Sequence, residues 1–126
     1  STTLTTSYAT VTLNQTATNT ATSLFQLASN VVTIKKAGTY MIMMEVTTDV
    51  TSGGARSESQ AELHKNGTTV VSGMYNRTSG RALATGACTT IQTVALNDTF
   101  EIKAKKAGSD TVVTAVDGVR LTFMEL

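Results

Sequence analysis

The sequence predicts an all-β domain built as a sandwich of two antiparallel sheets, and three observations lead to that fold class. Threonine recurs from Thr2 to Thr122, whereas proline and tryptophan are absent. Because threonine is β-branched and suits both wet and dry sheet faces, this composition favours strands over helices. Apolar and polar side chains also alternate in short runs, and turn residues separate the runs at close spacing. Such a pattern is typical of a sandwich or jelly roll, and about ten strands are expected.

The stretch 36–49 is predicted to be the central strand, because its side chains divide by parity into two different faces. One face is wholly apolar and consists of Tyr40, Ile42, Met44 and Val46. The other face is half apolar and half polar and consists of Met41, Met43, Glu45 and Thr47. The mixed face suits neither open water nor a closed core, but it suits contact with a neighbouring subunit.

The other strands are expected wherever apolar alternation returns. These runs are 8–13, 25–34 with a turn inside it, 60–65, 68–71, 87–94, 100–105, 111–116 and 119 to the end. Asn66-Gly67 predicts a type I′ hairpin, because both central positions of that turn need positive φ. Asp117-Gly118 predicts another turn, and the polar segments 47–59 and 75–84 are expected as a surface loop and a loop crossing. In 87–94 the parity of Ile91 requires a bulge or a two-sided strand.

Length and charge indicate one domain with no electrostatic attraction to nucleic acid or to an anionic membrane. The chain has 126 residues and a net charge of +1, and no apolar run approaches the length of a membrane span. Residues 1–7 are expected to form an extended N-terminal arm that is ordered only if something holds it, and residues 8–126 a single β domain. Two explanations for the start at Ser1 are expected, removal of an initiator methionine or removal of a leader, and the sequence does not distinguish between them.

No catalytic, cofactor-binding or metal-binding residue is assigned from the sequence. His64 is the only histidine, no Gly-x-Ser-x-Gly elbow exists, and His64 is expected on a charged strand surface. Cys88 is the only cysteine, so the chain cannot form an internal disulfide. Cys88 itself is expected to be a small core residue. The loop aspartates follow no calcium-binding spacing and are expected to form turns. An enzyme is therefore the least expected class.

Taken in order, several short motifs resemble those of the trimeric jelly rolls of the C1q and tumour-necrosis-factor type. They are Gly38-x-Tyr40-x-Ile42, Leu63-x-Lys65-Asn66-Gly67, Val94-x-x-Asn97-Asp98-x-Phe100-x-Ile102 and Val119-x-Leu121-x-Phe123. The set covers most of the chain from Phe25 onward, and departs from the family pattern at Asn97, where the family has glycine.

The resemblance implies a jelly roll that forms a homotrimer through its inner sheet. In that family the central and last strands pack against two further copies about a threefold axis. The residues that would face the axis here are Met41, Met43 and Glu45 from the central strand, and Arg120, Thr122 and Met124 from the last strand. Glu45 and Arg120 are expected to pair near the axis, where such pairs specify geometry more than they add stability.

The leading functional hypothesis is a structural protein of a bacteriophage virion: a trimeric decoration or cement protein on the capsid surface, bound to the major capsid protein or another virion protein. One alternative is the receptor- or carbohydrate-binding tip of a fibre, with Tyr75, Arg77 and Arg81 as candidate loop contacts. The other alternative is a secreted C1q-like or cytokine-like binding domain. Residues encoded before Ser1 would separate these three hypotheses.

Overall fold

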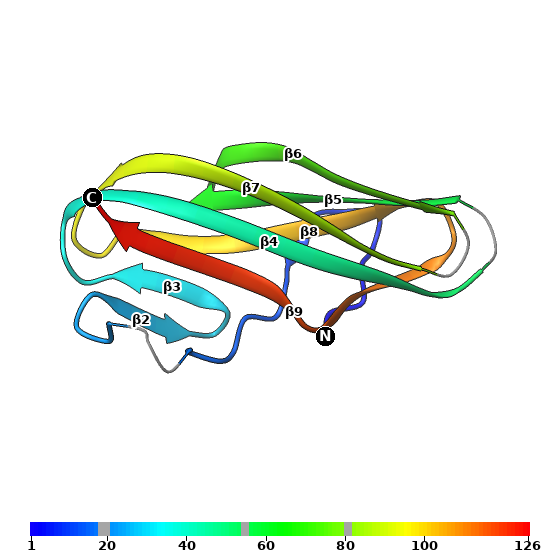
Figure 1. Cartoon of the computed structure of the whole chain (residues 1–126), viewed down its shortest axis with the longest axis horizontal. Coiled ribbons are helices and arrows are strands. Elements are labelled where there is room, and N and C mark those ends of the chain that lie inside the picture. Colours follow the sequence, from blue (N-terminus) through cyan, green and yellow to red (C-terminus); the bar gives the residue numbers. More distant parts are fainter. Residues whose placement is uncertain (18–20, 54–55, 80–81) are drawn as a thin grey trace.

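The fold is an all-β sandwich of two antiparallel sheets, as the sequence predicts (Figure 1). The structure is a computed structural model that describes residues 1–17, 21–53, 56–79 and 82–126, with only the backbone described at 72–75 and 78–79. Within these residues there are nine strands, which are β1 (Ala9–Thr10), β2 (Phe25–Ala28), β3 (Val31–Ile34), β4 (Gly38–Ser52), β5 (Arg56–Lys65), β6 (Thr68–Ser79), β7 (Leu83–Val94), β8 (Thr99–Ala107) and β9 (Thr111–Glu125). No helix long and apolar enough to cross a membrane occurs in them.

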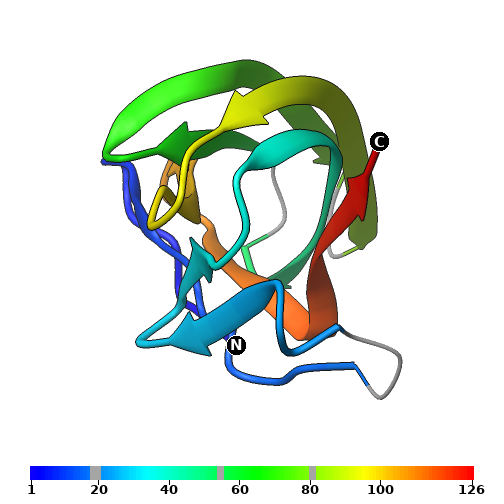
Figure 2. The same cartoon turned by 90° about the vertical axis from the view of Figure 1, so that its left-hand side faces the viewer.

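The two sheets differ in size. The larger one has the order β2-β3-β8-β5-β6, with β1 added on β8, and the smaller one has the order β7-β4-β9. Strands that are distant in sequence are therefore neighbours in each sheet, which is the jelly-roll arrangement. Figure 2 looks at the end of the molecule and shows the two layers curving around a shared interior. The strand β4 is the centre of the smaller sheet, as the stretch 36–49 predicts.

The apolar face of β4 packs inside this sandwich. Tyr40 and Met44 are fully buried, and they belong to the same core cluster as apolar residues of β8 such as Phe100, which is also fully buried. An aromatic cluster closes this part of the core, with ring centroids 5.8 Å apart for Phe25 and Tyr40 and 5.4 Å apart for Phe100 and Phe123. Burial of these large side chains supplies most of the hydrophobic stabilisation at this end.

The two polar segments predicted as loops are mostly strand, and that part of the prediction is wrong. β4 continues to Ser52 and β5 begins at Arg56, while β6 continues to Ser79 and β7 begins at Leu83. The prediction failed because the inward positions of these strands carry small polar residues, so no apolar alternation marks them. Those buried positions are Thr48, Ser57, Ser59 and Asn76.

The last strand is also longer than predicted. Asp117 and Gly118 do not separate two strands, because β9 runs from Thr111 to Glu125. Its pairing with β4 instead shifts register between Val46 and Thr48, and Asp117 adopts a positive φ of 56° there. A bulge thus absorbs the turn residues and keeps apolar side chains inward on both sides of it.

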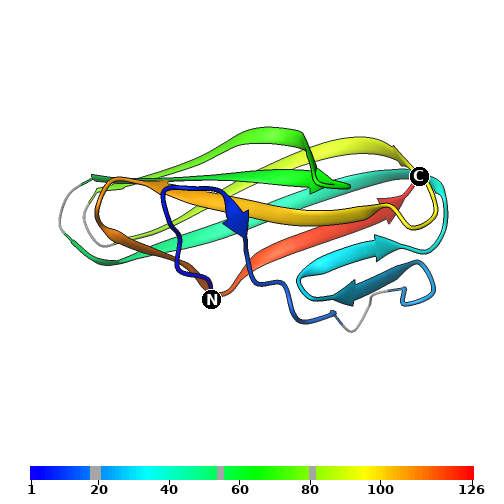
Figure 3. The same ribbon diagram turned by 180° about the vertical axis from the view of Figure 1, so that it is seen from behind.

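The N-terminal arm lies against its own chain, which holds it by backbone hydrogen bonds. The backbone N–H of Leu4 donates to the carbonyl of Val112 at 2.8 Å, and the N–H of Lys106 donates to the carbonyl of Thr5 at 2.8 Å. The Leu4 side chain is 4% exposed and belongs to the core. Figure 3 shows this segment beside β8 and β9, where it joins the edges of the two sheets.

The turns follow the predicted chemistry. Asn66 and Gly67 have positive φ values of 52° and 79° between β5 and β6, as a type I′ hairpin requires. Asp98 closes the turn before β8, accepting hydrogen bonds from the Asn66 side chain at 2.9 Å and the Ala95 N–H at 2.8 Å. These bonds, together with the attraction of Lys65, lower the pKa of the Asp98 carboxyl. The two turns at this end of the sandwich are therefore tied to each other.

Candidate functional site

The most distinctive surface is the part of the outward face of the β7-β4-β9 sheet formed by residues 87–91 of β7, 41–45 of β4 and 120–124 of β9, which we call the methionine face. Its apolar members are Met41 and Met43 on β4, Met124 on β9 and Ile91 on β7. Met43 is 36% exposed, Met124 48% and Ile91 62%, so the chain leaves several neighbouring apolar side chains partly uncovered on one side of the smaller sheet. Contiguous exposed apolar area of this kind marks a contact surface.

Strand register arranges the methionine face in rows across the three strands. One row is wholly apolar and reads Ile91–Met41–Met124 from β7 to β9. The next row reads Thr89–Met43–Thr122, and the third reads Ala87–Glu45–Arg120. Successive rows on one face of a sheet lie about 7 Å apart, because alternate residues share a face. Each row therefore lies at a different height along the strands and carries a different combination of side chains.

The charged row contains two opposite charges on adjacent strands. Glu45 on β4 and Arg120 on β9 are direct cross-strand partners, and Glu45 is half-buried whereas Arg120 is exposed. No ion pair joins Glu45 to Arg120, although several ion pairs occur elsewhere in the described chain, for example Lys36 with Glu125 at 2.7 Å. The methionine face thus carries one acidic and one basic group that are still available for partners.

All six residues predicted for a trimer interface lie on this outward face. They are Met41, Met43, Glu45, Arg120, Thr122 and Met124. None of the three methionines among them packs in the core of the single chain. Sequence reasoning missed Ile91, although its parity opposite to Cys88 and Val94 was the available signal. The β4–β7 ladder is regular, so the strand is two-sided and has no bulge.

The predicted loop contacts do not form a site within the described residues. Arg77 lies in strand β6 and is exposed, with its Nε 3.7 Å from the Glu58 carboxylate. The backbone of Tyr75 pairs with Gln60 in the same ladder, and its side chain lies outside the described part of the chain. Arg81 lies outside the described residues altogether. Hairpin strands thus replace the binding loop that was expected at Arg77.

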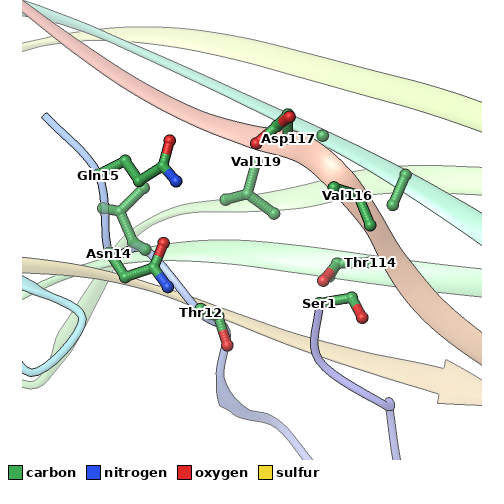
Figure 4. Close-up of a pocket in the computed structure, with 11 residues that line it drawn as sticks. Ser1, Thr12, Asn14, Gln15, Thr114, Val116, Asp117 and Val119 are labelled. Atoms are coloured by element: carbon green, nitrogen blue, oxygen red, sulfur yellow. The ribbon is translucent and has the colours of Figure 1, made fainter. Parts of the chain in front are cut away.

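A small polar pocket lies where the N-terminal segment meets the bulge of β9 (Figure 4). Its volume is about 220 Å³. Hydroxyl, amide and carboxylate groups line it, together with Val116 and Val119, and Figure 4 labels Ser1, Thr12, Asn14, Gln15, Thr114 and Asp117 among them. The hydroxyl of Thr2 donates to Thr12 at 2.9 Å and thereby helps to fix one wall. The pocket offers hydrogen bonds to a small polar ligand but no nucleophile with an adjacent base.

The residues considered for chemistry do not converge. His64 is 8% exposed, so the expectation of a surface histidine is wrong: its ring nitrogens lie 3.3 Å from Glu62 and 3.4 Å from the Gly67 carbonyl. Ser59 points into the sandwich, where its hydroxyl lies 2.9 Å from that of Thr48. Cys88 is half-buried against the core, and this burial raises the pKa of its thiol. No group of three or more potential metal ligands of the His, Cys, Asp or Glu type occurs among the described residues.

Comparison with known proteins supports the fold assignment. Crystal structures of murine APRIL match this chain with TM-scores of 0.53 to 0.55. The structure at pH 5.0 is 11% identical over 98% of this chain and 95% of that chain. The structure at pH 8.0 is 16% identical over 82% of this chain and 75% of that chain. No family model and no curated protein sequence matches. The chain therefore has a jelly-roll sandwich fold similar to that of the tumour-necrosis-factor type.

Proposed function

We propose that this protein is a non-enzymatic structural protein that assembles as a homotrimer through the methionine face. The observation that carries the proposal is the apolar row Ile91–Met41–Met124, in which Ile91 and Met124 are exposed and Met41 is half-buried, flanked by the exposed Met43. Covering one such side chain is worth about 1.5 to 3 kcal/mol. A threefold ring repeats each contact three times, so a small patch can hold the assembly.

Sedimentation of the purified chain tests the trimer directly. We expect a single species of three times the chain mass at micromolar concentration, and a monomer at that concentration would refute the proposal. Replacing Met41, Met43 and Met124 together by serine should convert the trimer to a folded monomer, because the apolar contact is lost while the core stays intact. Leu96→Ser is the matched control, since Leu96 is 57% exposed but lies outside the methionine face.

We further propose that the trimer serves on the capsid surface of a bacteriophage as a decoration or cement protein. A jelly roll without a disulfide or a convergent catalytic group in its described residues suits a purely structural part. The major capsid protein or another virion protein would be its partner. Peptide mass spectrometry of particles purified from the virus or cell that encodes the chain is the test. We expect the chain at a fixed stoichiometry to the shell protein, and its absence from purified particles would refute this role.

The polar pocket beside β9 favours a second candidate, a carbohydrate-binding tip of a fibre. Hydroxyl, amide and carboxylate groups around about 220 Å³ provide the directional hydrogen bonds that sugar hydroxyls require. A glycan array with the trimer tests this function. Binding that is lost in Asp117→Asn but kept in Asp49→Asn would favour the fibre tip over the capsid decoration protein. Absence of binding to any glycan on the array would remove this candidate.

A further inference from the structure

The methionine face has two edges, one on β7 and one on β9, which we call its β7 flank and its β9 flank. The residues at these two flanks differ in the apolar row and in the charged row, and this difference specifies how two copies can meet. This inference rests on the proposed assembly through that face. In the apolar row the β7 flank carries Ile91 and the β9 flank carries Met124. In the charged row the β7 flank carries only the small Ala87, the centre carries Glu45 and the β9 flank carries Arg120. The two flanks are therefore chemically different at these two heights.

A closed ring of three copies joins unlike surfaces, because each copy uses one surface toward its left neighbour and another toward its right neighbour. The smaller sheet has only three strands, so its two available surfaces are its β7 flank and its β9 flank. The β9 flank of one copy then meets the β4 centre and the β7 flank of the next copy. In a ring whose axis runs along these strands, rows at equal height come into contact.

Charge supports the same arrangement. Arg120 is exposed at the β9 flank, and Glu45 is separated from the β7 flank only by the methyl group of Ala87. A basic group approaching from the β7 side therefore reaches Glu45 without a bulky obstacle. Glu45 and Arg120 make no ion pair with each other within one chain, so both are available to a neighbour. Complementary charges at an interface fix register and exclude wrong arrangements.

We infer that, on the methionine face, Arg120 of one copy pairs with Glu45 of the next copy, while Met124 of the first copy packs on Ile91 of the second. The apolar row thus supplies the contact area and the charged row sets the direction and register of the ring. A shift by one row would place the guanidinium of Arg120 against Met43 and leave Glu45 without a partner. Within these three rows, the apolar and the charged contacts match in one alignment only.

The test is a charge reversal measured alone and in mixtures. Glu45→Arg gives a chain with two positive groups in the charged row, and Arg120→Glu gives a chain with two negative groups. Each variant alone should raise the concentration of half-assembly by about tenfold or more, because every contact in its ring joins like charges. The double variant Glu45→Arg/Arg120→Glu should assemble like the natural chain, because each contact again joins opposite charges.

Mixing the two single variants separates pairing between copies from pairing within a copy. If the pair joins neighbouring copies, an equimolar mixture should form mixed trimers at a several-fold lower concentration than either variant alone, since two of three contacts become attractive. Pairing within one copy predicts no gain on mixing, and that result would overturn the inference. Lys103→Glu is the matched control, because Lys103 lies on the larger sheet, 3.7 Å from Glu101, and should leave assembly unchanged.

Two measurements keep the outcomes apart. Circular dichroism and urea unfolding of each variant establish that a loss of assembly is not a loss of folding. Natural chain that sediments as a monomer would refute the proposed assembly itself. Natural chain that sediments as a trimer, with single reversals that assemble normally, would leave the assembly standing and overturn only the pairing of Arg120 with Glu45.

Discussion

The two ends of the sandwich are closed by different chemistry. At the end where β3 and β8 meet, the interior consists of large apolar side chains such as Tyr40, Phe100 and Ile34, all fully buried. At the opposite end, toward Ser52 of β4 and Arg56 of β5, the interior contains Thr48, Ser59 and Asn76, which are at most 5% exposed. Figure 1 shows that the same long strands run through both ends. One pair of sheets therefore combines two ways of filling a core.

The difference teaches how each end responds to change. At the apolar end, stability follows the area removed from water and tolerates small shifts of position. At the polar end, every buried donor and acceptor must find its partner, because an unsatisfied group costs about 1–3 kcal/mol. The Asn76 amide meets this requirement by donating to the Val46 carbonyl at 3.2 Å, to Thr48 at 3.3 Å and to the Ala84 carbonyl at 3.1 Å.

The largest expected effect lies at the apolar end. Phe100→Ala should lower the free energy of unfolding by about 3–5 kcal/mol, because it leaves a cavity beside Phe123 and removes a fully buried ring. Urea unfolding followed by circular dichroism measures the loss. The control is Leu96→Ala at the same end, where the side chain is 57% exposed and little change is expected. A similar loss in both variants would show that the ring is not what holds this end together.

The next effect tests the polar end. Asn76→Ala should lower the free energy of unfolding by about 2–3 kcal/mol, because the carbonyl of Ala84 and the carbonyl of Val46 lose a buried donor. Asn14→Ala is a suitable control, since Asn14 is exposed at the surface. The stabilities come from denaturant titration. A neutral Asn76→Ala would mean that water reaches this end and that its polar core does not need the amide.

A double substitution sharpens the comparison between the ends. Thr48→Val alone should cost about 1–2 kcal/mol, because it leaves the buried Ser59 hydroxyl without the partner at 2.9 Å. Adding Ser59→Ala should return the free energy of unfolding most of the way to that of the natural chain, because both hydroxyls are then replaced by apolar groups and the Asn76 amide, which loses Thr48, keeps the carbonyls of Val46 and Ala84 as acceptors. A double-mutant cycle in urea measures the coupling. Strict additivity of the two substitutions would show that the hydroxyls do not act as a pair.

The smallest effect depends on pH and concerns the rim of the apolar end. The pKa of Asp98 is lowered in the folded chain by the Asn66 amide, the Ala95 N–H and Lys65. Its stabilisation is therefore present above the ordinary carboxyl pKa and is lost as pH falls through the folded pKa. Asp98→Asn should cost about 1 kcal/mol at neutral pH and should flatten the decline of stability below pH of about 4. Unfolding midpoints measured across this range provide the check, and an unchanged slope would contradict it.

The apolar end could be predicted from the sequence, whereas the polar end could not. Alternation of large apolar side chains located the central strand through Tyr40 and the eighth strand through Phe100, and the turn chemistry of Asn66-Gly67 located the hairpin. At the polar end, inward positions such as Ser57 and Asn76 look like loop residues in the sequence. They become core residues only because Ser57 donates a hydrogen bond to Asp110 and Asn76 donates to carbonyls of β4 and β7, and sequence periodicity contains no signal for those bonds.

The candidate site also contains residues that could be placed from the sequence and residues that only the fold placed. Parity along β4 and β9 placed the six residues of the methionine face correctly on one outward surface, because alternation is a local property of a strand. Ile91 and Ala87 joined that surface only when the pairing of β7 with β4 aligned the rows. Likewise, the N-terminal segment reads as an unattached arm, and only the folded sandwich supplies the edge of β9 and the interior into which Leu4 packs.

The sequence by itself therefore determined that this is a β protein, which residues of its central strand turn inward, and which outward face stays apolar. These are consequences of side-chain alternation and of turn residues, which act over a few positions of the chain. Only the tertiary structure decided how far the strands extend, which polar groups lie inside, and which charges stand in the same row. Those features depend on pairing between strands that are distant in sequence, where register and hydrogen-bond partners are set by the fold as a whole.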